Sequence, residues 1–99
     1  MDTQITVADN PARRRYEIHA GDDLLGFAAY ELGDGLITFT HTEVDPSLGG
    51  RGVGSTLARH ALDDARDRGL KVQPLCPFIR GWIDRHPDYA SLVAEPATE

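Results

Sequence analysis

A glycine-rich segment stands directly before a predicted helix. Gly49, Gly50, Gly52 and Gly54 fall within six residues, and an amphipathic helical pattern starts at Val53. Glycine has no Cβ, so it lets a ligand approach the backbone closely. The first turn of a helix offers unpaired N–H groups and the positive end of the helix dipole. These residue types and this spacing predict an anion site, most often for phosphate.

Two common phosphate-binding motifs do not fit this segment. The Walker A motif needs a lysine directly after its last glycine, and Ser55 occupies that position. The dinucleotide motif G-x-G-x-x-G needs a third glycine where Leu57 stands. It also needs an acidic residue about 20 positions further on, near Pro74, where none occurs. A tight strand-to-helix turn without a ligand stays an alternative at this point.

Three strands are predicted before the glycine segment, around Tyr16 and Ile18, over residues 24–30 and over residues 36–44. The short turns between them contain glycine and aspartate, which is typical of antiparallel hairpins. Because side chains alternate along a strand, Ile37, Phe39, His41 and Glu43 are expected to share one face of the third strand.

After the glycine segment the hydrophobic period becomes helical. Apolar residues recur at helical spacing from Val53 to Ala65, and Gly69 predicts a left-handed C-terminal cap. A further strand is predicted over residues 70–75. A strand–helix–strand unit implies a crossover, which would make this strand parallel to the strand at 36–44.

The C-terminal part predicts a second, shorter helix. It runs from Pro77 to Arg85, since proline suits a first helical turn, and Asp88 is expected to cap a last turn. The predicted fold class is therefore α/β (α+β): a mixed, mostly antiparallel sheet with a strand–glycine loop–helix–strand crossover and a short C-terminal helix.

Length and composition limit the possible functions. The 99 residues predict a single domain (residues 1–99) with an ordered core from about 13 to 93. A net charge of −6 argues against nucleic-acid binding and suits cationic substrates such as amines. Cys76 is the only cysteine, which favours a reducing, cytoplasmic compartment. No segment has the roughly 18 consecutive apolar residues of a membrane span. We expect a monomer or weak homodimer with no membrane or nucleic-acid partner.

The sequence VDPSLGGRGVGSTL, residues 44–57, resembles the pyrophosphate loop of the GNAT superfamily, the acetyl-coenzyme A-dependent N-acetyltransferases. The pattern of that family is a strand ending in V-x-P, then [QR]-x-x-G-x-[GA], then a helix. Val44 and Pro46 match the first part, and Gly52 and Gly54 match the two glycines. Gly49 departs from the pattern, because it stands where glutamine or arginine is usual.

The resemblance extends over residues 16–93. The short chain and the sequence Cys76-Pro77-Phe78 are similar to the shortest GNAT branch, whose members have about one hundred residues and lack the usual N-terminal helices around the acceptor site. The resemblance implies a minimal GNAT fold. It also implies acetyl-coenzyme A as co-substrate and an amine acceptor. No pair of histidines has convincing zinc spacing and one cysteine cannot form a thiolate site, so no metal is predicted. The cofactor-binding residues that the resemblance implies are Glu43, Val44, Gly49, Gly50, Arg51, Gly52, Val53, Gly54 and Ser55.

Three side chains are candidates for catalysis under this resemblance. Cys76 lies at a predicted helix start, which favours a reactive thiolate, so it could be a nucleophile or a proton donor. A buried structural cysteine is the alternative. His41 could take a proton from the amine, because imidazole titrates near neutral pH, or it could be a packed histidine. Glu43 could orient His41 or act as the base itself. Tyr89 and Trp82 are expected to pack in the core.

The predicted function is therefore acetyl transfer to a primary amine of an unknown small molecule, peptide or protein. The alternative is a module that binds coenzyme A or acyl-coenzyme A without catalysis.

Overall fold

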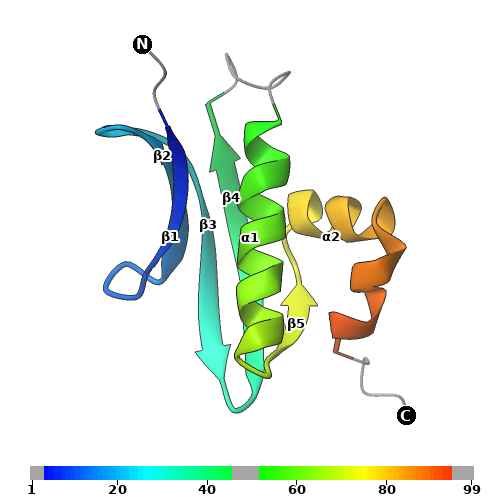
Figure 1. Cartoon of the computed structure of the whole chain (residues 1–99). Coiled ribbons are helices and arrows are strands. Elements are labelled where there is room, and N and C mark those ends of the chain that lie inside the picture. Colours follow the sequence, from blue (N-terminus) through cyan, green and yellow to red (C-terminus); the bar gives the residue numbers. More distant parts are fainter. Residues whose placement is uncertain (1–3, 46–51, 95–99) are drawn as a thin grey trace.

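A five-stranded sheet forms one layer of the protein, and a long helix covers one of its faces (Figure 1). The computed structural model describes residues 4–45 and 52–94. Each strand pairs with the next along the chain; β1 to β4 are antiparallel, and β5 is parallel to β4, as predicted. The strands are β1 (Ile5–Asn10), β2 (Arg15–Ala20), β3 (Asp23–Gly33), β4 (Leu36–Val44) and β5 (Lys71–Pro74).

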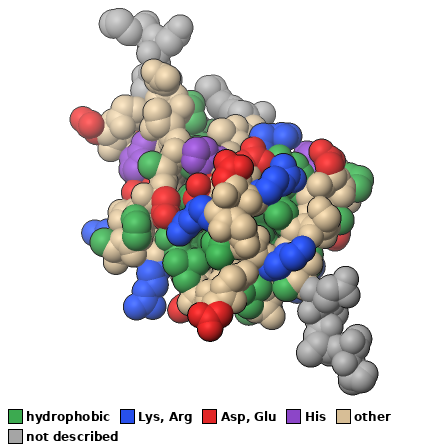
Figure 2. Space-filling view, turned by 60° about the horizontal axis from the view of Figure 1, so that its bottom comes forward, with side chains coloured by type: hydrophobic (Ala, Val, Ile, Leu, Met, Phe, Trp, Pro, Cys, Tyr) green, Lys and Arg blue, Asp and Glu red, His purple; other side chains and the backbone are tan. Residues whose placement is uncertain are grey.

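The helices are α1 (Val53–Asp67), α2 (Pro77–Asp84) and a 3-10 helix, η2 (Pro87–Leu92). None of the helices within residues 4–45 and 52–94 is both long and apolar enough to cross a membrane. Charges of both signs are interspersed on the face shown in Figure 2. The mixed sheet with its crossover helix is the fold that the sequence predicts.

Helix α1 has the apolar stripe and the C-terminal cap that its sequence predicts. Its buried side chains are spaced as expected for one face of a helix. Gly69 has a φ of 74°, and the N–H groups of Gly69 and Leu70 donate to the carbonyls of Arg66 and Ala65. This pattern is a Schellman motif, which needs a left-handed residue after the helix. The buried residues of α1 are Val53, Leu57, Ala58, Ala61, Leu62 and Ala65.

Strand β1 is an element that the sequence analysis did not predict. It pairs with β2 from Ile5↔Ala20 to Asn10↔Arg15, and it lies before residue 13, the expected start of the ordered core. As the edge strand of the sheet it has a neighbour on one side only, and none of its side chains is buried. A strand without a buried face shows little hydrophobic alternation, so its sequence carries a weak signal.

The last turn of the chain is capped differently from the prediction. The residue before η2 is His86, not Asp88, and no side chain in the described part of the chain caps this helix. Pro87 starts the turn, which leaves His86 at the capping position with its ring stacked on Trp82 at a centroid distance of 3.7 Å. The Nδ1–H of His86 donates to the carbonyl of Trp82 over 2.7 Å.

A β-bulge interrupts the pairing of β4 with β3. Tyr30 lies opposite Phe39, whereas its neighbour Ala29 lies opposite His41. Thr40 is therefore an extra residue in β4, and its hydroxyl lies 3.4 Å from the carbonyl oxygen of Ala29. An extra residue shifts the side-chain alternation beyond it by one position.

The bulge corrects the predicted face of β4. Ile37 and Phe39 are fully buried in the core that includes α1, while His41 and Glu43 are exposed. Simple alternation put all four side chains on one face, and that prediction is wrong. Because the bulge lies between Phe39 and His41, the two later side chains turn to the face opposite α1.

A polar network attaches the C-terminal end of α1 to the sheet. The Tyr16 hydroxyl donates to the Asp64 carboxylate, and Arg68 donates to Tyr16 and to Asp64, each over 3.2 Å. The Tyr30 hydroxyl donates to Asp9 over 2.5 Å, and Arg68 also lies 3.5 Å from Asp9. Burial and then the hydrogen bond to Asp64 raise the pKa of Tyr16. The network joins β1, β2 and β3 to α1.

Replacing Gly26 by alanine should destabilise the protein. A Cβ at this position would lie 2.6 Å from the carbonyl oxygen of Glu43 and 3.0 Å from the Cα of Val44. Since both are backbone atoms, β3 and β4 must separate locally. We expect Gly26→Ala to lower the free energy of unfolding by about 1–3 kcal/mol in urea denaturation. Gly33→Ala is the control, because nothing lies within 4 Å of its added Cβ. Equal losses in the two variants would contradict the close approach.

The stability of the protein should fall in alkali. Burial and then the hydrogen bond to Asp9 raise the pKa of Tyr30 from 10.0 to about 12. Between these pH values the unfolded chain loses the phenolic proton before the folded protein does, so the free energy of unfolding decreases as pH rises. The stabilisation that comes from the raised pKa of Tyr30 is fully present below pH 10. We expect urea midpoints, followed by Trp82 fluorescence, to fall across this window, and to fall less steeply in Tyr30→Phe. Identical slopes would refute the assignment.

Candidate active site

Strands β4 and β5 separate after only four residue pairs. The register runs from Leu36↔Lys71 to Phe39↔Pro74, and the Cys76 N–H still donates to the Phe39 carbonyl over 3.0 Å. Strand β5 ends there because the chain turns: the Leu75 N–H donates to the Gln73 carbonyl over 3.2 Å, and Pro77 begins α2. Within the described residues, Thr40–Val44 of β4 has no partner from β5. An extended ligand could pair with this edge as an added strand.

Helix α1 begins beside the end of β4, and its first N–H groups have no partner within the helix. Gly52 precedes the helix, and the first helical bond runs from the Thr56 N–H to the Gly52 carbonyl over 2.9 Å. The amides of Val53, Gly54 and Ser55 come before that bond, so they can donate to an anion. Gly49, Gly50 and Arg51, which were also predicted to bind the cofactor, lie outside the described residues.

The fold itself explains why glycine is needed at two positions of the loop. Gly52 has a φ of 73°, which side chains rarely adopt, and a Cβ on Gly54 would lie 2.7 Å from Cζ of Phe78. The close contact of Gly54 with Phe78 packs α2 against the first turn of α1. For these two positions, the turn and the packing explain the glycine without a ligand.

A depression of about 310 Å³ lies at the start of α1. Its wall includes Arg85 and His86, which follow α2, and neither was predicted from the sequence to bind a ligand. The Ser55 hydroxyl accepts a hydrogen bond from Trp82 Nε1 over 2.8 Å. No spacing in the sequence indicated this group, because folding brings α2 beside α1. The lining residues are Gly52, Gly54, Ser55, Phe78, Trp82, Arg85 and His86.

Cys76 lies where β4 and β5 separate, and it is buried, with 2% of its surface exposed. Its thiol donates to the Thr42 hydroxyl over 3.1 Å. The contact bridges the two separating strands on the side of the core. Thr42 was missed by the sequence analysis; the bulge, which turns Thr42 toward the core, leaves no local signal in the sequence.

His41 and Glu43 form a pair on the opposite face of β4. His41 Nε2 lies 2.8 Å from Glu43 Oε2, and the two side chains are 59% and 64% exposed. An exposed pair of this kind adds little to stability. The His41 ring lies 6.0 Å from the ring of Phe27 in β3. The structure thus brings His41 and Glu43 together and places Cys76 on the other side of the strand.

The two aromatic residues expected in the core are there. Trp82 is 1% exposed and Tyr89 is 5% exposed. The Tyr89 hydroxyl donates to Asp63 over 2.8 Å, and Arg59 lies 3.4 Å from it. Burial and then the bond to Asp63 raise the pKa of Tyr89. These contacts attach η2 to α1.

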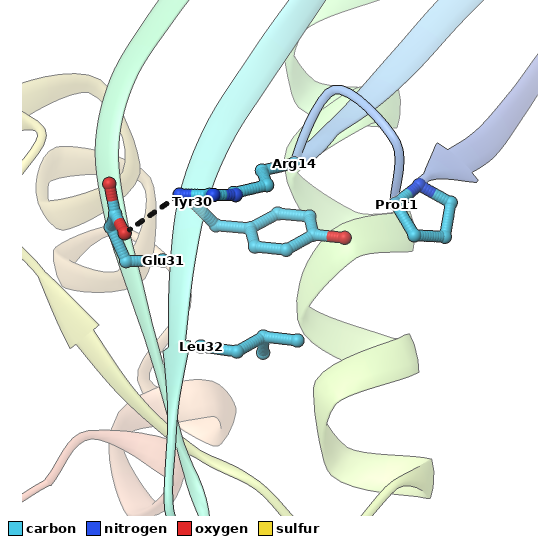
Figure 3. Close-up of a pocket in the computed structure, with 5 residues that line it drawn as sticks. All are labelled: Pro11, Arg14, Tyr30, Glu31 and Leu32. Atoms are coloured by element: carbon cyan, nitrogen blue, oxygen red, sulfur yellow. Dashed lines mark ion pairs between the residues drawn. The ribbon is translucent and has the colours of Figure 1, made fainter.

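A second depression, of about 410 Å³, lies near the turn between β1 and β2. Figure 3 shows the Tyr30 side chain lying between Arg14 and Leu32, with its ring pointing toward Pro11. Arg14 pairs with Glu31 over 3.6 Å, and the Tyr30 hydroxyl is bound to Asp9. The polar groups here bind one another, so we place no chemistry in it. Across residues 4–45 and 52–94, no three His, Cys, Asp or Glu residues group as metal ligands.

The family model described as GCN5-related N-acetyl-transferase matches residues 15–92. The chain belongs to the GCN5-related N-acetyltransferase family. The match covers the sheet from β2 onward, both helices and the edge of β4 that β5 leaves open.

Named relatives agree with this family. Streptothricin acetyltransferase of Streptomyces lavendulae is 41% identical over 63 residues, which are 62% of this chain and 33% of that protein. Protein NATD1 of Danio rerio is 28% identical over 93 residues, 90% of this chain and 84% of that protein. The chain thus spans about a third of the streptothricin enzyme, and its match to Gallus gallus NATD1 covers 51% of that protein.

Solved structures share the fold. A Staphylococcus aureus protein described as GCN5-like superposes with a TM-score of 0.69 and 23% identity, over 99% of this chain and 94% of that one. The ribosomal-protein-S18-alanine N-acetyltransferase of Escherichia coli gives a TM-score of 0.57 at 22% identity, over 62% of this chain and 41% of that one. At these identities, the similarity to the two structures shows a shared fold and nothing more.

The buried position of Cys76 predicts that its thiol reacts slowly with reagents in solution. We expect a disulfide reagent such as DTNB to modify the native protein roughly tenfold or more slowly than the protein in concentrated urea, because the reaction needs access to the sulfur. Absorbance of the released thiolate measures both rates, and Cys76→Ala gives the background. A native rate equal to the unfolded rate would show that the sulfur is open to solvent.

Proposed function

We propose that the protein is an acetyl-coenzyme A-dependent N-acetyltransferase that acts on a primary amine. The observation that carries the proposal is that two sets of backbone groups, neither of which has a strand or helix partner among the described residues, lie at one place. The β4 edge at Thr40–Val44 lies open where β5 leaves it, and the free amides of α1 begin beside the end of β4. A diphosphate joined to an extended thiol arm fits this arrangement.

Each part of the coenzyme would have its own binding groups. The amides of Val53, Gly54 and Ser55 would donate to the diphosphate, together with Gly49–Gly52 of the loop. The backbone of Thr42 and Val44 would pair with the arm, as in strand addition, because the Glu43 backbone faces Phe27 of β3. When bound, acetyl-coenzyme A supplies the activated acetyl group as a thioester.

His41 is the proposed base. A carboxylate only accepts hydrogen bonds, so the contact with Glu43 keeps the proton on His41 Nε2 and leaves Nδ1 as the basic nitrogen. His41 Nδ1 would take a proton from the substrate ammonium, directly or through water, and the neutral amine would then attack the thioester carbonyl. As the carbon–sulfur bond breaks and the amide forms, the nitrogen would lose its second proton to water. Glu43 holds the ring and stabilises it when it is charged.

Cys76 is a better proton donor than nucleophile in this arrangement. Its thiol is buried and donates to Thr42, while His41 lies on the opposite face of β4 and cannot deprotonate it directly. The departing coenzyme A sulfur takes up a proton as the amide forms. We propose that Cys76 and Thr42 line the path of this sulfur, and that Cys76 delivers that proton and regains one from water before the next turnover. An acetylated Cys76 intermediate is the competing route.

Ligand-dependent stability and acetyl transfer test the function together. Coenzyme A at a hundredfold excess over its Kd should stabilise the folded protein by about 2.7 kcal/mol, whereas ATP and NAD should not. Acetyl transfer to an alkylamine should be detectable by release of coenzyme A thiol. His41→Gln should slow transfer by roughly a hundredfold and leave coenzyme A binding unchanged, because the base acts only in the chemical step.

The outcomes separate this proposal from its alternative. Coenzyme A binding without transfer to any amine would identify a coenzyme A-binding module. Stabilisation by ATP or NAD but not by coenzyme A would refute both. Radiolabelled acetyl retained on the protein and lost in Cys76→Ala would replace direct transfer by the covalent route.

A further inference from the structure

The face of the sheet opposite α1 carries a row of side chains centred on Phe27. Phe27 of β3 pairs with Glu17 of β2 and with Glu43 of β4. The guanidinium of Arg15 lies 4.5 Å from the centroid of the Phe27 ring, and the His41 ring lies 6.0 Å from it. An aromatic ring with a carboxylate on each side is therefore next to the proposed base.

The two carboxylates of this row differ in how they are bound. Glu17 is only 12% exposed, and Arg15, Asn10 and His19 surround it. Burial alone would raise the pKa of Glu17, but the hydrogen bonds from Arg15 and Asn10 hold it below its usual value. Glu43 is 64% exposed and contacts His41. Glu43 is thus the carboxylate that an incoming cation can reach.

A depression of about 210 Å³ lies beside Glu43, between the end of β4 and the start of β3. Its wall is apolar except for two carboxylates, and none of the described residues that line it is basic. Such a lining complements an alkyl chain that ends in a positive charge. The lining residues are Leu24, Leu25, Gly26, Phe27, Glu43, Val44 and Asp45.

We propose that this depression is the acceptor subsite and that it takes a lysine side chain of a protein segment. The inference rests on the proposed acetyltransferase function. The apolar stem of lysine would lie against Leu24, Leu25 and Phe27, and its ammonium would meet Glu43 beside His41. His41 then takes the proton, and the neutral amine faces the open edge of β4 where the thioester would lie.

The size and setting of the depression favour a side chain of a larger partner over a free metabolite. At about 210 Å³ the depression is smaller than the roughly 300–1,000 Å³ of pockets that enclose a whole small molecule. The exposure of His41 and Glu43 leaves room for a partner's backbone above the sheet. The net charge of −6 also attracts a cationic segment over long distances.

Two exposed leucines of β3 provide a matched pair of variants. Leu24 is 44% exposed and lines the depression, whereas Leu32 is 52% exposed and lies near the other end of the same strand. Leu24→Lys should raise the KM for a lysine peptide about tenfold through repulsion between like charges. The kcat and the coenzyme A Kd should not change. Leu32→Lys should leave all three constants as they are.

Acceptor peptides with side chains of different length test whether the depression binds the alkyl part of lysine. In a blocked tripeptide, lysine should have a KM roughly tenfold lower than diaminopropionic acid, whose stem is shorter, because fewer methylene groups are buried. Leu24→Lys should reduce this preference, and n-butylamine should be a poorer substrate than the lysine peptide.

Each contrary result has a distinct meaning. Acetyl transfer with equal KM values for both peptides, or equal effects of Leu24→Lys and Leu32→Lys, would refute the subsite and leave the acetyltransferase function intact. Transfer to n-butylamine as efficient as to the peptide would show that the acceptor is a small amine. Failure of coenzyme A binding or of all transfer would refute the function and the subsite together.

Discussion

The early separation of β4 and β5 is the constraint on which the candidate site depends. Their pairing ends at Phe39↔Pro74 because the chain turns at Leu75, whose N–H donates to the Gln73 carbonyl, and Pro77 then starts α2. Strand β4 continues to Val44, so within residues 4–45 and 52–94 its last residues have no partner strand on this side. An unpaired edge is normally a liability, which proteins cover or shorten. Here the edge ends beside the first amides of α1, and in the proposed function a bound ligand pairs with it.

The bulge at Thr40 divides the groups around this edge between two faces. Thr42 turns toward the core and meets Cys76, whereas His41 and Glu43 turn toward solvent. The division suits a transfer reaction, because the leaving sulfur and the incoming amine need different surroundings. In the proposed reaction, the buried Cys76 thiol and the Thr42 hydroxyl would line the path of the leaving sulfur, and the exposed His41 imidazole would receive a proton from the amine.

The rest of the fold holds these parts in place. The hydrogen bonds of Tyr16 and Arg68 with Asp64 attach one end of α1 to the sheet, and the Trp82–Ser55 bond with the Phe78–Gly54 contact attaches α2 to its other end. The first turn of α1 is thereby held beside the open edge. Membership of the GCN5-related N-acetyltransferase family is consistent with this arrangement, since the family model covers the sheet from β2 onward together with α1 and α2.

The sequence alone determined the elements whose signals are local. Patterns within short segments predicted the helix that starts at Val53 and its glycine cap at Gly69. The order strand, helix, strand predicted that β5 is parallel to β4, and the glycine loop indicated the family. Only the tertiary structure decided the face of His41, the partner of Cys76 and the place of Arg85. A bulge arises from the pairing of two strands, and contacts between Thr42 and Cys76 or between α1 and α2 join segments far apart in the chain. Spacing along one segment cannot encode either kind of information.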